Sequence, residues 1–418
     1  MQLNSTRALK NPSSVELAYK KFRARTDVGF TRLPYDTEAI NESIKLGEQI
    51  RNQFDQLIIV GMGGSSMGPR CLHEISEGLH YKKNSTVGSV DRLFFLDNVD
   101  SVETEKVLTK IKDLRKTAWL FISKSGSTIE VLWTFDLIIQ LYQEKNIEIW
   151  PYTFYITEDT SNPLNNLALL HKRPRLKIPI DVGGRFSVLS PVGLVVSEYL
   201  NFDTRLLIAG GKEVLEQASS ETQVIQCVDE YLQSFKRQEA ITLFWFYNSN
   251  MRWFGCWLQQ LWAESLGKKT NIHNQPAPPF SSPMICIGAC DQHSILQQIM
   301  DGPRDKFVNF FRFKNVEECS FKVSSTHFEE TKILEGLNFG QLIKAEAIGT
   351  EKALQNAGVS TLSFTLNNLD EKNIGFLFMF FQMIIATLGE HEEIDAFNQP
   401  GVALSKKMTL EVLQKNKS

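Results

Sequence analysis

The feature that most constrains the fold is a repeated unit: a short run of β-branched or aromatic residues, a small polar loop, and then a helical stretch. In the first half of the chain the apolar runs are Leu57–Val60, Leu93–Leu96, Trp119–Ile122 and Trp150–Ile156. Such runs are expected to be strands buried on both faces. Buried strands that alternate with helices are typical of a parallel sheet in a doubly wound α/β domain.

A second set of runs predicts a second parallel α/β unit: Ile241–Tyr247, Met284–Ile287, Val308–Phe313 and Thr361–Thr365. We therefore expect a helical N-terminal extension over residues 1–40, a first domain over 41–191, a second domain over 192–390 and a tail over 391–418, which ends in a polar helix. The longest uncharged run, residues 374–389, falls short of the roughly twenty residues that a membrane span needs. We interpret it as a buried core helix that closes the second unit.

Composition favours a soluble protein. The 418 residues are 42% hydrophobic and 22% charged, with a net charge of -3, so neither nucleic acid nor a membrane is an expected partner. The N-terminus has no apolar stretch of the signal-peptide type, which predicts a cytoplasmic location. The six cysteines are scattered without a metal-ligand spacing, so we expect buried, reduced thiols and no metal.

Two glycine- and hydroxyl-rich loops follow predicted strands, where ligands of open α/β sheets bind. The first, GMGGSSMGP from Gly61, matches neither the dinucleotide fingerprint nor the P-loop. It offers backbone N–H groups at Gly64 and the Ser65 hydroxyl to an anion, and the alternative is a tight turn that needs glycine.

The second loop, Ser123–Thr128, carries four hydroxyls and one ammonium before a helix. Helix capping alone would explain some of these hydroxyls. Four exceed what capping needs, and they suit a phosphate monoester with three acceptor oxygens. We therefore expect Ser123, Lys124, Ser125 and Thr128 to contribute to a phosphate site.

Two further stretches suggest catalysis, one through a fixed positive charge and one through a base. Arg185 follows two glycines, which lets the backbone present a permanently charged guanidinium; the alternative is a structural salt bridge. Gln260 and Glu264 are four residues apart on a predicted helix over 251–267 and so share a face. The helix dipole disfavours a carboxylate near the C-terminus, which suits Glu264 as a general base. The alternative is an exposed surface glutamate.

Two other residues are ambiguous by themselves. His293 follows a strand in Asp291-Gln292-His293 and could be an acid–base group or a structural residue. Lys406 lies in a polar tail, where a lysine is normally solvated.

Seven blocks, in order over about residues 57–407, resemble the glucose-6-phosphate isomerase family, whose members have two sugar-isomerase (SIS) domains, each a three-layer α-β-α sandwich. They are VGMGGSSMGP, FISKSGSTIE, GGRFSVLSPVGL, LQQLWAESLGKK, DQHSILQQIMDGP, LIKAEAIGT and FNQPGVALSK. The resemblance implies an aldose–ketose isomerase of glycolysis and gluconeogenesis that acts on a sugar phosphate without a cofactor. It also implies a homodimer with shared active sites.

The resemblance assigns roles by position. It implies that Ser65, Ser123, Ser125 and Thr128 bind phosphate beside Lys124, and that Arg185 stabilises the enediolate. Glu264 resembles the base and Gln260 its neighbour. His293 resembles the ring-opening histidine, which in this family reaches the neighbouring subunit's site. Glu130 resembles the carboxylate that orients this histidine. Lys406 resembles a lysine that assists at the ring oxygen.

One departure is informative, because Ala403 stands where the closing signature of the family usually has glutamate. The loss of that carboxylate could alter how the tail is anchored. Two other functions remain open at this point. One is a non-catalytic sugar-phosphate sensor, which would need neither Glu264 nor His293. The other is an isomerase that also accepts mannose 6-phosphate.

Overall fold

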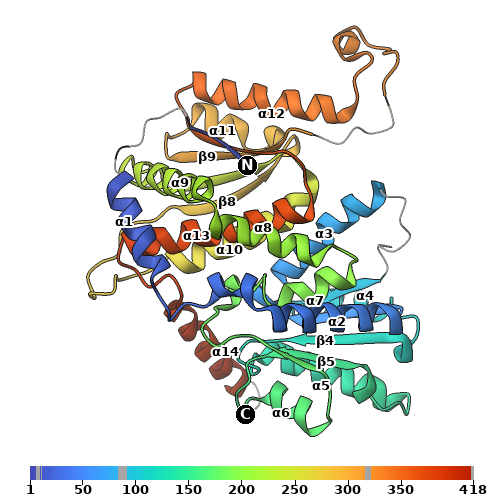
Figure 1. Ribbon diagram of the computed structural model, residues 1–418. Helices are drawn as coiled ribbons and strands as arrows, with labels where there is room; N and C mark the ends of the chain where they lie inside the picture. Colours follow the sequence, from blue (N-terminus) through green and yellow to red (C-terminus); the bar gives the residue numbers. More distant parts are fainter. Residues whose placement is uncertain (6–9, 11, 83–91, 316–321, 416–418) are drawn as a thin grey trace.

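The computed structural model describes residues 1–5, 10, 12–82, 92–315 and 322–415 (Figure 1). The first of its two sheets contains β2 (Gln56–Gly61), β3 (Leu93–Leu96), β4 (Thr117–Ile122), β5 (Thr153–Thr157) and β6 (Arg175–Lys177), in the order β3-β2-β4-β5-β6. All of its neighbouring strands are parallel. Residues 150–152 form a 3₁₀ turn instead of the expected start of β5. The three-residue β6 was not predicted, because it has no apolar run.

The second sheet has the order β1-β10-β9-β7-β8. Its strands are β1 (Gln2–Ser5), β7 (Ile241–Phe246), β8 (Ser282–Ile287), β9 (Lys306–Phe313) and β10 (Ser360–Leu366). Four of them are parallel, as predicted, whereas β1 runs antiparallel to β10. Helix α1 (Pro12–Arg23) lies within the expected helical extension, whereas residues 2–5 form this strand. They cover the otherwise unpaired edge of β10, which would be open to pairing with another chain.

Helices cover both faces of each sheet, so the α/β expectation is confirmed (Figure 1). The outer face of the first sheet packs on α4 (Ser101–Leu108), α5 (Ile129–Glu144) and α6 (Pro163–Leu170). The outer face of the second packs on α11 (Leu296–Asp301) and α12 (Phe339–Asn356).

The inner faces share one continuous hydrophobic core. Its helices are α1 (Pro12–Arg23), α2 (Thr37–Gln53), α3 (Met67–Lys82), α7 (Pro191–Tyr199), α8 (Thr204–Glu216), α9 (Ala218–Lys236), α10 (Arg252–Leu266) and α13 (Glu371–His391). Helices α3 and α10 contact each other directly between the two sheets. Because side chains from both units interlock there, the loops of the two sheets are held in a defined relation.

The uncharged run lies within α13, whose most apolar window is 89% buried. Within the described ranges this is the one helix long and apolar enough to span a bilayer, and here it is a core helix. It crosses α8 (Thr204–Glu216) at glycines: a Cβ on Gly375 would lie 1.8 Å from the Leu207 carbonyl oxygen, and one on Gly210 would lie 1.9 Å from the Lys372 carbonyl oxygen.

Three of the cysteines, Cys71, Cys227 and Cys286, are buried thiols, as expected. Cys256 is half-buried, and Cys290 is exposed, which corrects the expectation for that residue. Cys290 is exposed because it lies in the turn that follows β8, outside the sheet. Cys319 lies outside the described residues.

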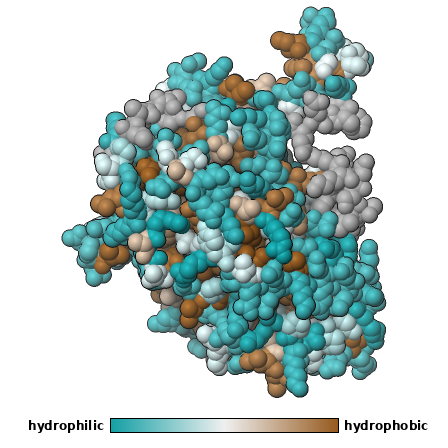
Figure 2. Space-filling view, in the orientation of Figure 1, coloured by the Kyte–Doolittle hydropathy of each residue, from teal (hydrophilic) through white to brown (hydrophobic). Residues whose placement is uncertain are grey.

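Exposed apolar side chains occur on several elements, and two of these lie at the periphery of the fold. One is the projecting segment 323–338 at the upper right of Figure 1, where Phe328 and Ile333 are exposed and where Figure 2 shows brown patches. The other is the terminal helix α14 (Ala403–Lys415), which has no buried residue among those described. Leu404 and Val412 are among its exposed side chains.

The helix crossing leads to a stability prediction. Gly375→Ala places a methyl group against a backbone carbonyl, and overpacking of this kind should lower the free energy of unfolding by roughly 3 kcal/mol. Gly349→Ala is the matched control, since nothing lies within 4 Å of a Cβ at this exposed position in α12. It should leave stability unchanged or raise it by up to about 1 kcal/mol, because alanine favours helix over glycine. Urea unfolding of both variants measures the difference; equal midpoints would contradict the packing argument.

Candidate active site

The two hydroxyl-bearing loops follow β2 and β4, which are neighbouring strands. The chain runs from β2 outward to β3 and then returns to β4 on the other side, so the strand order reverses between β2 and β4. In open α/β sheets ligands bind in the crevice at such a switch point, outside the carboxyl ends of the strands. The topology thus brings the two predicted phosphate loops to one location.

The hydroxyls of the second loop bond to each other. The Ser123 and Thr128 oxygens are 2.8 Å apart, and the Ser127 hydroxyl lies 3.1 Å from that of Ser125. Thr128 is the N-cap residue of α5, yet its side chain makes no capping hydrogen bond. Capping therefore does not account for this hydroxyl, and its part in a phosphate site stays a prediction.

Lys124 is directed elsewhere. Its ammonium lies 3.3 Å from the Glu158 carboxylate and donates to the Ile180 carbonyl at 2.9 Å. An ammonium has three donors, so these contacts leave capacity for one more acceptor. A phosphate contact by Lys124 stays a prediction.

The first loop begins with the 3₁₀ turn η2 (Gly63–Ser65) and lies against the arginine loop. A Cβ on Gly64 would be 2.3 Å from the carbonyl carbon of Gly184, which precedes Arg185. Only glycine allows this approach of two backbones. The loop also adjoins the predicted base helix, because a Cβ on Gly63 would be 3.0 Å from the Gln260 amide nitrogen. Ser65 is buried at this junction.

Arg185 lies at the centre of the site, in the turn η6 (Gly184–Phe186), and is only 2% exposed. Burial lowers the pKa of its guanidinium, and the negative charge of Glu264 opposes that shift. The neutral acceptors of its N–H groups are Ser265 Oγ at 2.7 Å, Ala396 O at 2.6 Å, Asn398 O at 3.1 Å and Gln399 Oε1 at 3.2 Å.

Glu264 completes the group from the last turn of α10. One of its oxygens lies 3.3 Å from Arg185 Nη1 and accepts a hydrogen bond from Gln260 Nε2 at 3.2 Å. The carboxylate remains 28% exposed, so it is open to a ligand. Gln260 Oε1 is buried without a hydrogen-bond partner. Both side chains line a cleft of about 500 Å³, so Glu264 is not an isolated surface residue.

The same cleft contains two residues that the sequence reasoning missed. Lys268 donates to the Glu264 carbonyl oxygen at 2.9 Å and also to the Asn398 carbonyl. Burial, followed by repulsion from Arg185, lowers the pKa of its ammonium to about 8. Gln399 reaches Arg185 from the closing segment. Both lie inside motifs already noted, GKK and FNQPG, but only the fold shows that these motifs meet.

Three predicted residues lie apart from this group. His293 is exposed in the turn after β8, and Glu130 is exposed in the first turn of α5. Lys406 is exposed on α14. Within one chain the structure therefore brings together the base, the arginine and the glycine loops, but neither the histidine nor the tail lysine.

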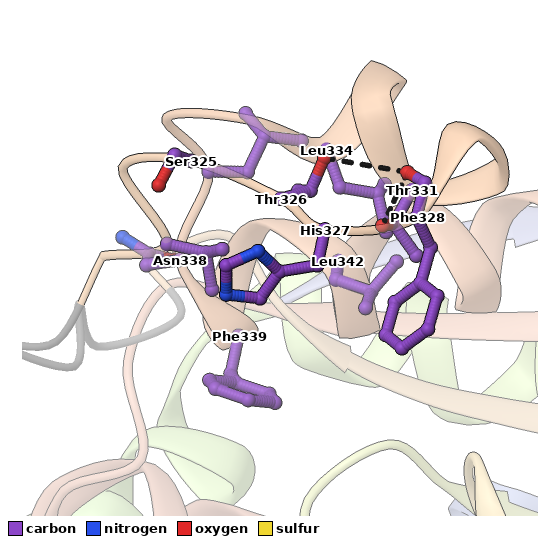
Figure 3. Close-up of a pocket in the computed structure, with 11 residues that line it drawn as sticks. Ser325, Thr326, His327, Phe328, Thr331, Leu334, Asn338, Phe339 and Leu342 are labelled. Carbon is purple, nitrogen blue, oxygen red and sulfur yellow. Dashed lines mark hydrogen bonds between the residues drawn. The ribbon is translucent and has the colours of Figure 1, made fainter.

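A second hollow, of about 310 Å³, lies in the projecting segment (Figure 3). Its lining includes His327, Phe328, Leu334, Phe339 and Leu342 and contains neither lysine nor arginine. An apolar pocket of this kind does not suit a phosphate monoester. In the part of the chain that the structure describes, no group of three or more His, Cys, Asp or Glu side chains could hold a metal ion.

Comparisons with known proteins agree with this geometry. The chain is 33% identical over 383 residues to a probable glucose-6-phosphate isomerase of Methanococcus maripaludis, covering 90% of this chain and 83% of the relative. It is 32% identical over 398 residues to the glucose-6-phosphate isomerase of Campylobacter jejuni, covering 93% and 92%. A crystal structure of a glucose-6-phosphate isomerase from Chlamydia trachomatis has a TM-score of 0.81 at 21% identity and covers 100% of this chain and 89% of that chain.

The two α/β units and the similarity to proteins named as isomerases define a protein of the sugar-isomerase class. The family model described as phosphoglucose isomerase matches residues 36–418. The chain belongs to the phosphoglucose isomerase family.

The contact between the glycine loop and the arginine loop yields a second prediction. Gly64→Ala should push the two loops apart and displace Arg185, because the methyl group would overlap the Gly184 carbonyl. Misplacement by about 1 Å can cost on the order of 100-fold in rate, so isomerase kcat/KM should fall by about that factor. Gly349→Ala again serves as control and should retain full activity. Unchanged kinetics in Gly64→Ala would show that the close approach is not needed.

Proposed function

We propose that this protein is a glucose-6-phosphate isomerase, which interconverts glucose 6-phosphate and fructose 6-phosphate with Glu264 as the base. The observation that carries the proposal is the partly exposed Glu264 carboxylate beside the buried Arg185 guanidinium, in a cleft next to the glycine loop. A carboxylate with a fixed positive neighbour can accept a proton from carbon while the negative charge that develops on the substrate is stabilised.

Substrate binding begins at the phosphate. In this proposal the hydroxyls of Ser65, Ser123, Ser125 and Thr128 and the backbone at Gly64 hold the phosphate at the switch point. The carbon chain then extends toward Gln260, whose buried Oε1 can accept a hydrogen bond from a sugar hydroxyl. Anchoring the remote phosphate places C1 and C2 near Glu264 and converts binding energy into orientation.

Ring opening precedes the isomerisation. His293, oriented by Glu130 and assisted by Lys406, transfers a proton between the ring oxygen and the C1 hydroxyl. The C1–O5 bond breaks, the C1 hydroxyl loses its proton and O5 gains one, which leaves the open-chain aldehyde. No atom is added or lost in this step.

Proton transfer between carbons follows. Glu264 removes the proton from C2, and the electron pair forms the C1–C2 double bond of a cis-enediolate. The guanidinium of Arg185 remains charged and offsets the negative oxygen. Glu264 then returns the proton to C1 while the hydroxyl proton of O2 passes to O1, which gives the C2 carbonyl and C1 hydroxyl of the ketose.

A homodimer with shared sites forms part of the proposal. His293 and Glu130 are exposed in one chain and lie outside the cleft with Glu264, so a second copy could bring the histidine to that cleft. Exposed apolar residues Ile129 and Trp133 flank Glu130 on α5, and apolar side chains of this kind are typical of an interface.

We also propose a cytoplasmic location and a role in glycolysis and gluconeogenesis. The five cysteines that the structure describes are all free thiols, which suits a reducing compartment.

Removal of the base tests the proposed chemistry. Glu264→Gln keeps the side-chain size but removes the proton acceptor, so turnover should fall by 10²- to 10⁴-fold, the usual range for a general acid–base group. Glu144→Gln is the matched control, since Glu144 is an exposed glutamate at the end of another helix, α5. A coupled assay for fructose 6-phosphate measures turnover, and loss of deuterium from C2-labelled substrate reports proton abstraction. Near-normal turnover in Glu264→Gln would refute the assignment, and wild-type turnover of mannose 6-phosphate would show the broader specificity.

Mixed variants test the shared site. If His293 serves the partner's Glu264, a hybrid of Glu264→Gln and His293→Leu subunits contains one site with both mutations and one intact site. Co-refolding of equal amounts should then restore about a quarter of wild-type activity, because about half of the dimers are hybrids and each has one of two sites. Neither variant should regain activity alone. If both groups come from the same chain, the mixture will stay inactive.

A further inference from the structure

The residues that follow α13 return to the cleft as a short irregular stretch, here called the closing segment (residues 396–402). Arg185 holds it through the carbonyls of Ala396 and Asn398 and the side chain of Gln399. Four of its residues, Gln399 to Val402, line the cleft together with Glu264. The position of this segment therefore determines part of the wall around the base.

A second cation, Lys268, also contacts the closing segment. Lys268 lies just past the end of α10, whose C-cap is Gly267. Its ammonium donates to the carbonyl of Glu264 and to that of Asn398, the oxygen that also accepts from Arg185. One backbone carbonyl thus receives two cationic donors.

We propose that Lys268 is a positioning residue: it fastens Asn398 to the carboxyl end of α10 and so holds the closing segment, with Gln399, beside Glu264. The inference rests on the proposed function, because it concerns the geometry around the base. It gives Lys268 no contact with the reacting atoms.

Helix capping alone does not explain these contacts. A lysine near a helix C-terminus commonly donates to the last carbonyls of its own helix and offsets their negative dipole. Lys268 makes one such bond, to Glu264, but its second acceptor lies 130 residues further along the chain. That long-range bond links the end of α10 to the closing segment, and the two also meet around Arg185.

Stability does not explain the choice of a lysine either. The ammonium is half-buried and lies near the Arg185 guanidinium, and both conditions disfavour its charge. The carboxylates of Asp395, before the closing segment, and Glu264, on α10, favour the charge. Lys269, the next residue, also lines the cleft. A residue whose charged form is disfavoured by its surroundings is better explained by function than by folding.

The tail increases the dependence on this contact. Position 403 is alanine, so the carboxylate that the family's closing signature usually has is missing there. Helix α14, which begins at Ala403, has no buried residue among those described. Lys268, Arg185 and Asp395 are charged groups that hold the stretch leading into α14 and Lys406.

The test compares Lys268→Met with Lys344→Met. Lys344 is exposed on α12 and also donates to a backbone carbonyl, that of Lys314, but far along the chain from the cleft. We expect Lys268→Met to lower kcat by about 10- to 100-fold with KM changed by less than about threefold, because positioning affects the reacting geometry more than binding. Amide hydrogen exchange in peptides covering 396–402 should become faster in this variant. The control should match wild type in both measurements.

Lys268→Arg supplies a second test with a variant that keeps the positive charge. Above a pH of about 8, the lowered pKa of Lys268, the ammonium loses its proton and its bonds to the carbonyls weaken, so wild-type kcat should decline as pH rises through this value. A guanidinium stays charged, so the decline should move to higher pH in Lys268→Arg. Wild-type exchange and kcat in Lys268→Met, or an unchanged alkaline limb in Lys268→Arg, would overturn the proposal. Hydrogen exchange reports the position of the segment even if the wild-type protein fails to isomerise glucose 6-phosphate. A failure of the proposed function can therefore be distinguished from a failure of the role proposed for Lys268.

Discussion

The rest of the site depends on the buried guanidinium of Arg185. A charge that is 2% exposed is costly unless its donors are satisfied. Here every nitrogen of the guanidinium has an acceptor within the chain, and the neighbouring Glu264 carboxylate offsets the charge. These contacts join the arginine loop, the base helix and the closing segment. Such a group is also suited to catalysis, because its charge is fixed before the substrate arrives and needs no reorganisation during the reaction.

The hydrophobic core determines where that guanidinium lies. In α13, which is otherwise apolar over most of its length, Gln382 donates to the Phe186 carbonyl at 3.0 Å and so holds the turn that carries Arg185. The ring of Phe186 stacks on Phe30 at 5.0 Å and packs against Phe397 at 5.2 Å. Phe186, which follows Arg185, is therefore fixed in the shared core, and Gly184, which precedes Arg185, lies against the backbone of Gly64. Precision at the site comes from packing on both sides of the arginine.

Much of the fold could be predicted from the chain itself, because buried parallel strands are read as short apolar runs. The strand at Leu93–Leu96 has the predicted bounds, and the core helix around 374–389 is present as α13. Two strands were not predicted, each for a different reason. Strand β6 has too few apolar residues to be recognised, and β1 exists because the edge of β10 needs a partner. Neither requirement is visible in a local window of sequence.

The candidate site also combines features that are visible in the sequence with contacts that are not. The local patterns are the hydroxyls after β4, the glycines before Arg185 and the glutamine–glutamate pair on one helix face. The sequence by itself therefore determined which residue types were available and on which elements they lie. Only the tertiary structure decided that Arg185 contacts Glu264, that Lys124 is directed to Glu158, and that Lys268 reaches Asn398. The physical reason is that each of these contacts joins segments tens to hundreds of residues apart, whose separation depends on the packing of both sheets and all the helices between them. Periodicity and capping are local properties, whereas the meeting of two charges is a property of the whole core.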